Sequence, residues 1–239
     1  MPETLQRPKY KFLSGSMLKL IAVLCMVIDH AALVLWPVLW FFRIPLTFFG
    51  KTVSVYWILR RIGRLAFPIF CFLIAEGFSH TRDQKKYGLR LLIFAFLSEI
   101  PFNLMHSGNI LHSGNQNVYF TLFLGLMMIY AYENIGKELW KYLAMTAVGT
   151  LATLLRPDYG LRGVILMFVI HLLQRKPAAQ AVISYPLLSG GPAAFAAFVP
   201  INLYNGKRGF IQGPVLKFLF YIFYPLHILI LVGIRYLLA

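Results

Sequence analysis

Residues 17–37 read MLKLIAVLCMVIDHAALVLWP, and this stretch decides the class of fold. A transmembrane helix needs about 20 consecutive, mostly apolar residues, and this run supplies them with only Lys19 and the Asp29-His30 pair as strongly polar exceptions. The short basic segment before it has no small-residue cleavage signature, which favours a retained first helix over a removed signal peptide. The sequence therefore predicts a membrane span at 17–37.

The rest of the chain has the same character. Over 239 residues, 59% are hydrophobic and only 13% are charged, with a mean hydropathy of +0.69. An average soluble domain has about 25% charged residues, so these charges are too few to cover a water-soluble surface. The length fits one helical bundle. We predict an all-α, multi-pass integral membrane bundle of about nine helices (eight to ten), with 1–16 as an N-terminal tail and 17–239 as one transmembrane domain.

Eight further apolar runs predict the other spans. They are 64–80, 89–106, 117–133, 140–156, 161–174, 178–190, 192–205 and 214–238. Prolines and glycines interrupt the region 178–205, which therefore fits two short spans, one kinked span or a re-entrant pair. The stretch 38–62 is apolar and aromatic but has four basic residues, a combination typical of an interfacial helix.

The net charge of +15 comes from 23 Lys and Arg residues against 8 acidic ones. The cations lie in short loops between apolar runs, which suits the positive-inside rule and anionic lipid headgroups better than a nucleic-acid-binding face. We therefore expect a lipid bilayer, and no nucleic acid, as a partner. The basic loops recur at every second loop, which predicts a cytoplasmic N-terminus. Arg60, Arg61 and Arg64 break the pattern, so either they have a specific role or the first two spans are misplaced.

Three acidic residues fall inside predicted spans: Asp29, Glu76 and Glu99. A charge in the middle of a membrane costs at least ~2.5 kcal/mol, so such residues face the bundle interior and mark functional sites. His30 adds a group that accepts and returns protons near neutral pH. Neighbouring residues diverge on a helix, so we expect Asp29 to contact another helix and not His30. Arg64 is a candidate partner for Asp29 or Glu76, or alternatively an interface anchor.

Two basic loops are candidates for binding phosphate groups. One contains Arg82, Lys85, Lys86 and Arg90, and the other is Asn205-Gly-Lys207-Arg208-Gly, whose glycines would let a phosphate approach the backbone. Loops that set topology and touch lipid phosphates are the alternative. In the last span, a structural hydrogen bond between His227 and Tyr224 is expected.

Cys25 and Cys71 lie in apolar runs as small hydrophobic residues, and no Cys/His spacing predicts a metal site. No P-loop, Rossmann fingerprint, G-x-S-x-G or H-E-x-x-H motif is present. From the residues alone, the protein is a membrane protein with an ionisable interior, which fits a transporter as well as an enzyme.

Six ordered sequence blocks resemble the TraX family, named for the conjugal-transfer protein that acetylates the N-terminus of pilin. The blocks span the chain from about residue 17 to its end: Leu18-Lys-Leu-Ile-Ala…Ile28-Asp29-His30; Gly63-Arg64-Leu-Ala-Phe-Pro68-Ile-Phe…Glu76-Gly-Phe; Tyr87-Gly-Leu-Arg90-Leu-Leu…Ser98-Glu99-Ile-Pro101-Phe; Asn117-Val-Tyr-Phe-Thr121-Leu; Leu203-Tyr204-Asn205-Gly-Lys207-Arg208-Gly; and Tyr221-Ile-Phe-Tyr224-Pro225-Leu-His227. The TraX family is in turn similar to transmembrane acyltransferases that acetylate surface glycans and heparan sulfate.

This resemblance implies an acyltransferase-like domain and an acetyl-CoA-dependent reaction in a bacterial cytoplasmic membrane. His30 matches the essential histidine of the glycan enzymes, as general base or acetyl carrier, with Asp29 or Glu76 orienting it. By residue type alone, and not by the resemblance, Arg64, Asn103 or Asn117 are candidates to stabilise the oxyanion, and Glu99 is a further candidate catalytic residue. Arg82, Lys85, Lys86, Arg90, Asn205, Lys207 and Arg208 would bind the phosphates of coenzyme A. The glycan enzymes have an arginine early in the first span, where this chain has Lys19.

The function predicted from the sequence is therefore transfer of an acetyl group from acetyl-CoA to an amine or hydroxyl, such as a pilin N-terminus or a cell-envelope glycan. A proton-coupled transporter or flippase, using Asp29, His30, Glu76 and Glu99 as a relay, is the alternative. A non-catalytic membrane scaffold is a third class, and it would not require a buried Asp-His pair.

Overall fold

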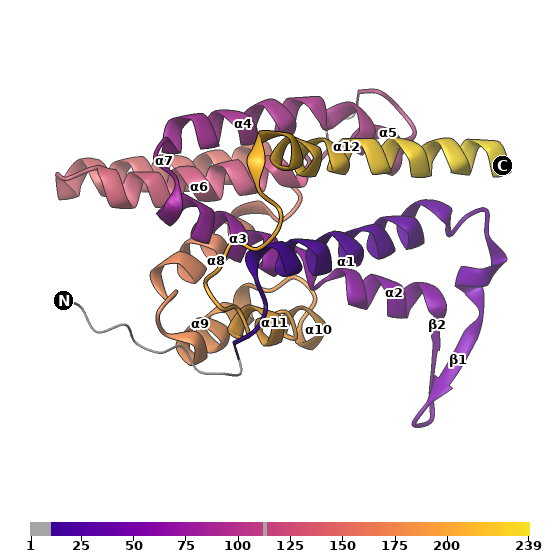
Figure 1. The fold of residues 1–239 in the computed structure, drawn as a ribbon. Coiled ribbons are helices and arrows are strands. Elements are labelled where there is room, and N and C mark those ends of the chain that lie inside the picture. The colour runs from indigo at the N-terminus through magenta and orange to yellow at the C-terminus, as the bar shows by residue number, and fades with distance from the viewer. Residues whose placement is uncertain (1–10, 112–113) are drawn as a thin grey trace.

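A computed structural model describes residues 11–111 and 114–239 and is almost entirely helical (Figure 1). Residues 1–10 of the predicted N-terminal tail lie outside the described residues. The elements are, in chain order, α1 (Gly15–Leu35), η1 (Trp40–Arg43), β1 (Pro45–Phe48), β2 (Lys51–Ser54), α2 (Val55–Gly63), α3 (Ala66–His80), α4 (Gln84–Leu97), α5 (Glu99–Ser107), α6 (Val118–Asn134), α7 (Glu138–Leu155), α8 (Gly160–Leu172), α9 (Pro177–Ser184), η2 (Tyr185–Leu187), α10 (Pro192–Phe195), α11 (Phe198–Asn202) and α12 (Gly213–Leu238).

Helix α1 forms where the first apolar run predicted a span. Ser14 caps it, because its hydroxyl accepts a hydrogen bond from the Met17 N–H at 3.3 Å and so satisfies one of the unpaired donors at a helix start. The helix ends at Leu35, shortly before Pro37. Each other predicted span also coincides with a helix or a pair of helices, and the broken region 178–205 consists of α9, η2, α10 and α11.

The predicted number of spans is not confirmed. Among the described residues, α1 and α12 are long and apolar enough to cross a membrane, and α4 with α5 adds a third candidate if this pair, bent by 40°, is one span. The bend falls at Ser98, between the two helices and three residues before Pro101. Pro101 has no N–H to donate to the carbonyl of Leu97, four residues earlier, and its ring clashes with that carbonyl, which explains why α4 ends at Leu97. The other helices of the bundle are shorter or less apolar.

The stretch 38–62 does not form the single interfacial helix that we predicted. It contains η1, an antiparallel hairpin of β1 and β2, and most of α2. The hairpin projects away from the bundle (Figure 1), and the Phe49 side chain at its tip is fully exposed. Trp40, at the start of η1 before the hairpin, is 75% exposed. A hairpin of two four-residue strands has too weak a period-2 pattern to stand out among apolar residues. The all-α class is confirmed with this one exception.

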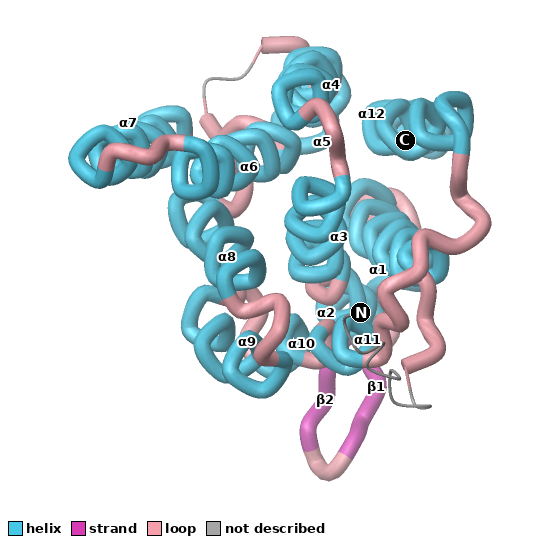
Figure 2. Tube along the Cα trace, turned by 60° about the vertical axis from the view of Figure 1, so that its left-hand side comes forward, coloured by secondary structure: helices cyan, strands magenta, loops and turns pink. Residues whose placement is uncertain are grey.

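Helix α3 is the centre of the bundle. Figure 2 shows it surrounded by α1, α4, α6, α8 and α11, and it packs directly against α1, α6, α8 and α11. Nine of its fifteen residues are buried, because it has neighbours on all sides. Helix α7 is the opposite case: only Ala152 is buried, and Trp140 and Leu154 are exposed. Apolar side chains on an outer helix are expected where lipid, not water, is the solvent.

The loop before α12 is fixed to the start of α1. The N–H groups of Gly15 and Ser16 donate to the carbonyls of Lys207 and Arg208 at 2.8 and 2.9 Å, and the Ser16 hydroxyl accepts from Ile211 N–H at 2.7 Å. These bonds join segments almost 200 residues apart. They hold the second predicted basic loop beside the first helix.

Candidate functional site

One elongated cavity of about 570 Å³ lies between α1, α3 and α12. Along α1 its lining runs from Gly15 to His30, a rise of roughly 22 Å at 1.5 Å per residue. Helices α1 and α12 lie side by side (Figure 1). The middle of the cavity is lined by apolar side chains, among them Val23, Met26 and Phe70. The cavity is therefore long and narrow, with chemically different ends.

The end near the start of α1 is rich in cations. Five basic side chains line it: Lys19, Arg82, Arg90, Arg208 and Lys217. Arg208 and Lys217 lie within electrostatic range of Lys19. The same end includes Thr81 and Gly206. The mutual repulsion of these positive charges raises the free energy of the protein, and a bound polyanion would lower it by neutralising them. We call these five side chains the cationic mouth.

The cationic mouth contains residues from both of the basic loops that the sequence predicted to bind phosphate groups. Arg82 and Arg90 come from the loop and helix after α3, and Arg208 comes from the loop before α12, so these three predicted phosphate-binding residues converge. The other four, Lys85, Lys86, Asn205 and Lys207, do not line the cavity. Asn205 has a local role instead, because its side-chain oxygen accepts from Lys207 N–H at 2.8 Å. Asp83 caps α4 by accepting from Lys86 N–H, and this hydrogen bond lowers the pKa of the Asp83 carboxyl.

The opposite end of the cavity contains Asp29 and His30. Asp29 forms an ion pair with Arg60 of α2, which confirms that it contacts another helix and not its neighbour His30. Arg64 was a candidate partner for Asp29 or Glu76, or alternatively an interface anchor. Arg64 instead packs its aliphatic stem against Gly190, while Arg61 donates to the Gly190 carbonyl at 3.1 Å. The three arginines that broke the charge pattern thus each have a defined contact.

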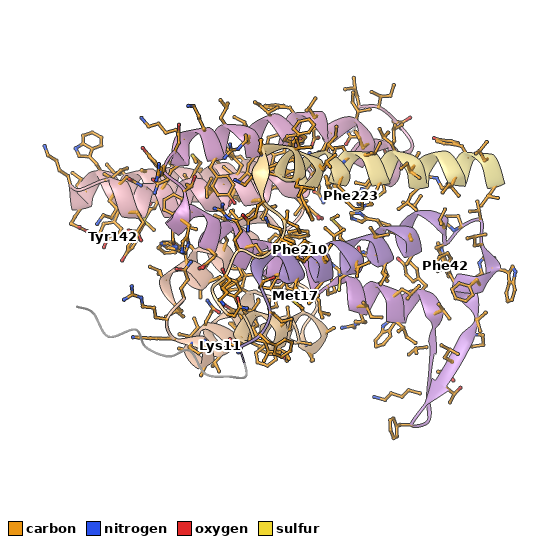
Figure 3. The ribbon with its side chains drawn as sticks, viewed as in Figure 1. Lys11, Met17, Phe42, Tyr142, Phe210 and Phe223 are labelled. Carbon is orange, nitrogen blue, oxygen red and sulfur yellow. The ribbon has the colours of Figure 1, made fainter. Side chains whose placement is uncertain are left out.

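His30 makes a polar contact with a second histidine at this end. Its Nδ1 lies 2.7 Å from Nε2 of His227 on α12, and the Nδ1 of His227 lies 2.8 Å from the Phe223 carbonyl oxygen. Figure 3 labels Phe223, which marks the turn of α12 preceding His227. His30 lines the cavity and His227 does not. The described hydrogen bonds include none between the His227 ring and the Tyr224 hydroxyl; the two rings meet edge to face at 5.9 Å.

Glu76, Glu99 and Asn117 do not join this histidine pair. Glu76 lines the cavity, but it lies ten residues from Ala66, the first residue of α3. This is a rise of roughly 15 Å along the helix, and it brings Glu76 close to His80. Glu99 accepts hydrogen bonds from the backbone and side-chain N–H groups of Asn117, and neither lines the cavity. Asn117 also caps α6. The Glu99–Asn117 contact therefore fastens the start of α6 to α5.

The sequence analysis missed three charged residues of the cavity. Lys19 and Lys217 are single cations inside long apolar runs, and only the fold brings them together. Asp158 lies in the loop between α7 and α8 and lines the cavity. Burial raises the pKa of the Asp158 carboxyl above its ordinary value, while the nearby His106, Arg64 and Arg60 oppose this shift. Arg156-Pro-Asp158 reads as an ordinary loop in sequence, so no local signal identifies it.

Gly63 makes a close approach between α1 and α2 possible, and this gives a first prediction. A Cβ atom at Gly63 would overlap the Asp29 side chain. Gly63→Ala should therefore displace Asp29 from Arg60 and lower stability by about 1–3 kcal/mol, the usual cost of overpacking. Thermal denaturation of the detergent-purified protein measures the effect. Gly233→Ala is the control, since a Cβ atom there meets open space and alanine favours a helix; equal stability of the two variants would contradict the packing.

The fold and the site together define a helical protein of membrane type, with a long cavity that is basic at one end and holds a histidine pair at the other. A family model described as TraX protein matches residues 14–235, and the chain belongs to this family. The probable fimbrial assembly protein FimC, serogroup H1, of Dichelobacter nodosus is 29% identical over 91% of this chain and 94% of its own length. An uncharacterized protein of Rickettsia prowazekii is 29% identical over 49% of this chain and 37% of its own. No solved structure matches.

Proposed function

We propose that this protein is an acetyltransferase of the bacterial cytoplasmic membrane that transfers the acetyl group of acetyl-CoA to an acceptor of the pilus or cell envelope. One observation supports this most directly: a single cavity joins the cationic mouth to His30. Acetyl-CoA has the matching form, a polyphosphate head on a long thin arm that ends in the reactive thioester. Family membership and the similarity to a probable fimbrial assembly protein point to the same kind of process.

In this proposal the cationic mouth binds the phosphates of coenzyme A. Arginine and lysine form charge-assisted hydrogen bonds with phosphate that are about twice as strong as neutral ones. The apolar middle of the cavity, with Val23, Met26 and Phe70, accommodates the arm. From Lys19 to His30 the helix rises roughly 16 Å, so a head bound at the mouth leaves its far end near the histidine. The mouth then faces the cytoplasm, which agrees with the predicted orientation and with the source of acetyl-CoA.

His30 is the proposed general base. It takes the proton from the attacking amine or hydroxyl as the new bond to the acetyl carbon forms. It returns this proton to the sulfur of coenzyme A when the thioester bond breaks, so protons and electrons balance over the cycle. Asp29, already paired with Arg60, helps to set the charge at this end.

An amine acceptor fits the inner end better than a hydroxyl. Asp158 lines the cavity there, whereas Asp29 is already paired with Arg60. A carboxylate attracts a protonated amine, which releases its extra proton to solvent through that carboxylate before it attacks the thioester. The N-terminus of a pilin subunit is an acceptor of this kind. A neutral glycan hydroxyl gains less, because it can only donate a hydrogen bond to the carboxylate.

The proton-coupled transporter is the alternative. It requires a relay through Asp29, His30, Glu76 and Glu99, but Glu99 is bonded to Asn117 outside the cavity. Asp29, for its part, is neutralised by Arg60. The described contacts therefore favour the enzyme.

The direct experiment measures binding and transfer with the purified full-length protein. Coenzyme A and acetyl-CoA should raise its melting temperature, whereas ATP and NADH, which have phosphates but no pantetheine arm, should raise it less. Incubation with isotopically labelled acetyl-CoA and a panel of peptides and glycans should then label a peptide N-terminus, as detected by mass spectrometry. No stabilisation at millimolar coenzyme A would overturn the proposal and make the transporter the leading function.

A further inference from the structure

The contact between His30 and His227 determines which nitrogen of His30 is basic. His227 Nδ1 lies 2.8 Å from the Phe223 carbonyl oxygen, and a carbonyl only accepts hydrogen bonds. His227 therefore donates from Nδ1. A neutral imidazole has one N–H, so Nε2 of His227 is a bare acceptor.

The same reasoning extends to His30. Its Nδ1 lies 2.7 Å from the bare Nε2 of His227, so His30 must donate from Nδ1. Its own Nε2 then has a free lone pair. His30 lines the cavity and His227 stands behind it, so the lone pair belongs to the residue that can meet a substrate.

We propose that His227 is a positioning residue that fixes the reactive tautomer of His30 and shares the proton that His30 accepts. This inference rests on the proposed function for its catalytic consequence. When His30 takes a proton at Nε2, its Nδ1 proton can shift to His227 Nε2, and the positive charge is then spread over both rings. When Nε2 of His30 gives its proton to the departing sulfur, both rings return to their starting tautomers. No group beyond the two histidines gains or loses a proton.

The packing around the pair supports a fixed geometry. The two rings lie nearly parallel, 13° apart, with centroids separated by 4.9 Å, and Phe223 stacks on His227 at 5.1 Å. Tyr224 meets the edge of both rings. The charged and titratable groups nearest His30, besides His227, are Arg60 of α2 and His106 of α5, with Asp29 next to it on α1. None of these accepts a hydrogen bond from His30 in place of His227 among the described contacts.

The experiment reads the tautomer directly by nitrogen NMR of histidine-labelled protein in detergent, because a protonated and a bare ring nitrogen have well-separated shifts. His30→Gln assigns the signal. In the natural protein we expect His30 to be protonated at Nδ1. His227→Leu removes the acceptor and should shift His30 toward the Nε2–H form. His227→Gln retains an acceptor oxygen and should preserve the Nδ1–H form.

Kinetics test the consequence. We expect His227→Leu to lower kcat by roughly 10²-fold, the lower range for general-base catalysis, with an unchanged KM for acetyl-CoA. His227→Gln should recover part of this loss, because it restores the tautomer but cannot take a proton. His171→Gln is the matched control: His171 is bonded to Glu133 at 2.7 Å and does not line the cavity, so its loss should leave kcat unchanged.

An Nε2–H tautomer of His30 in the natural protein would overturn the inference, as would a His227→Leu variant with the natural tautomer and kcat. The tautomer measurement does not depend on acetyl transfer. An Nδ1–H tautomer that depends on His227 in a protein that neither binds coenzyme A nor transfers acetyl groups would refute the proposed function and leave the positioning role intact.

Discussion

Replacement of His30 by glutamine should lower the rate of acetyl transfer by about 10²- to 10⁴-fold, the contribution that a positioned general base makes. Glutamine is close to histidine in size and remains polar, but it cannot accept a proton at neutral pH. The affinity for acetyl-CoA should change little, because the cationic mouth lies roughly 16 Å away along α1. The measurements are the turnover of labelled acetyl-CoA and, separately, calorimetric binding of coenzyme A.

The separation of binding from turnover makes this variant informative. A fall in turnover with unchanged coenzyme A binding places His30 at the reacting atoms. Equal loss of both would instead indicate that the variant is misfolded or that the phosphates bind near His30. Unchanged turnover would remove His30 from the mechanism, whatever the binding shows.

Much of the helical framework can be predicted from the sequence. Apolar runs of 13 to 25 residues located every helix of the bundle except α2, because a helix with lipid or protein on all sides needs a continuous apolar sequence. The hairpin of β1 and β2 was missed, since strands of four residues leave too short a pattern. The number of spans could not be fixed, because a run such as 161–174 is shorter than a membrane is thick and fits a buried helix equally well.

The site was predictable only in part, and the reason is physical. A polar residue in an apolar run is easily recognised, because placing it in a membrane costs free energy and therefore needs a reason. Asp29 and His30 were identified from the sequence in this way. The partner of such a residue cannot be recognised in the same way. Arg60 and Arg64 are equally plausible partners in sequence, and only the close packing of Gly63 on Asp29 selects Arg60. His227 likewise gives no sign of contact with a residue almost 200 positions earlier.

The cationic mouth provides the prediction with the second largest effect. Reversal of Arg82 and Arg208 together, as Arg82→Glu with Arg208→Glu, should weaken coenzyme A binding by roughly 10²-fold. Each arginine lies at the exposed end of the cavity, where a charge-assisted hydrogen bond contributes about 1.5 kcal/mol, so two contribute about 3 kcal/mol. Isothermal calorimetry measures the change, and high salt should reduce it.

The matched comparison is Lys85→Glu with Lys207→Glu. This variant makes the same change in charge in the same two loops, and Lys207 is adjacent to Arg208, but neither lysine lines the cavity. Exposed charges at a distance contribute about 0–1 kcal/mol, so binding should weaken by less than about 10-fold. Equal losses from both variants would mean that coenzyme A responds to the general charge of these loops and not to the cavity. A larger loss from the arginine pair requires direct contact at the mouth, because net charge is the same in both variants and only position differs.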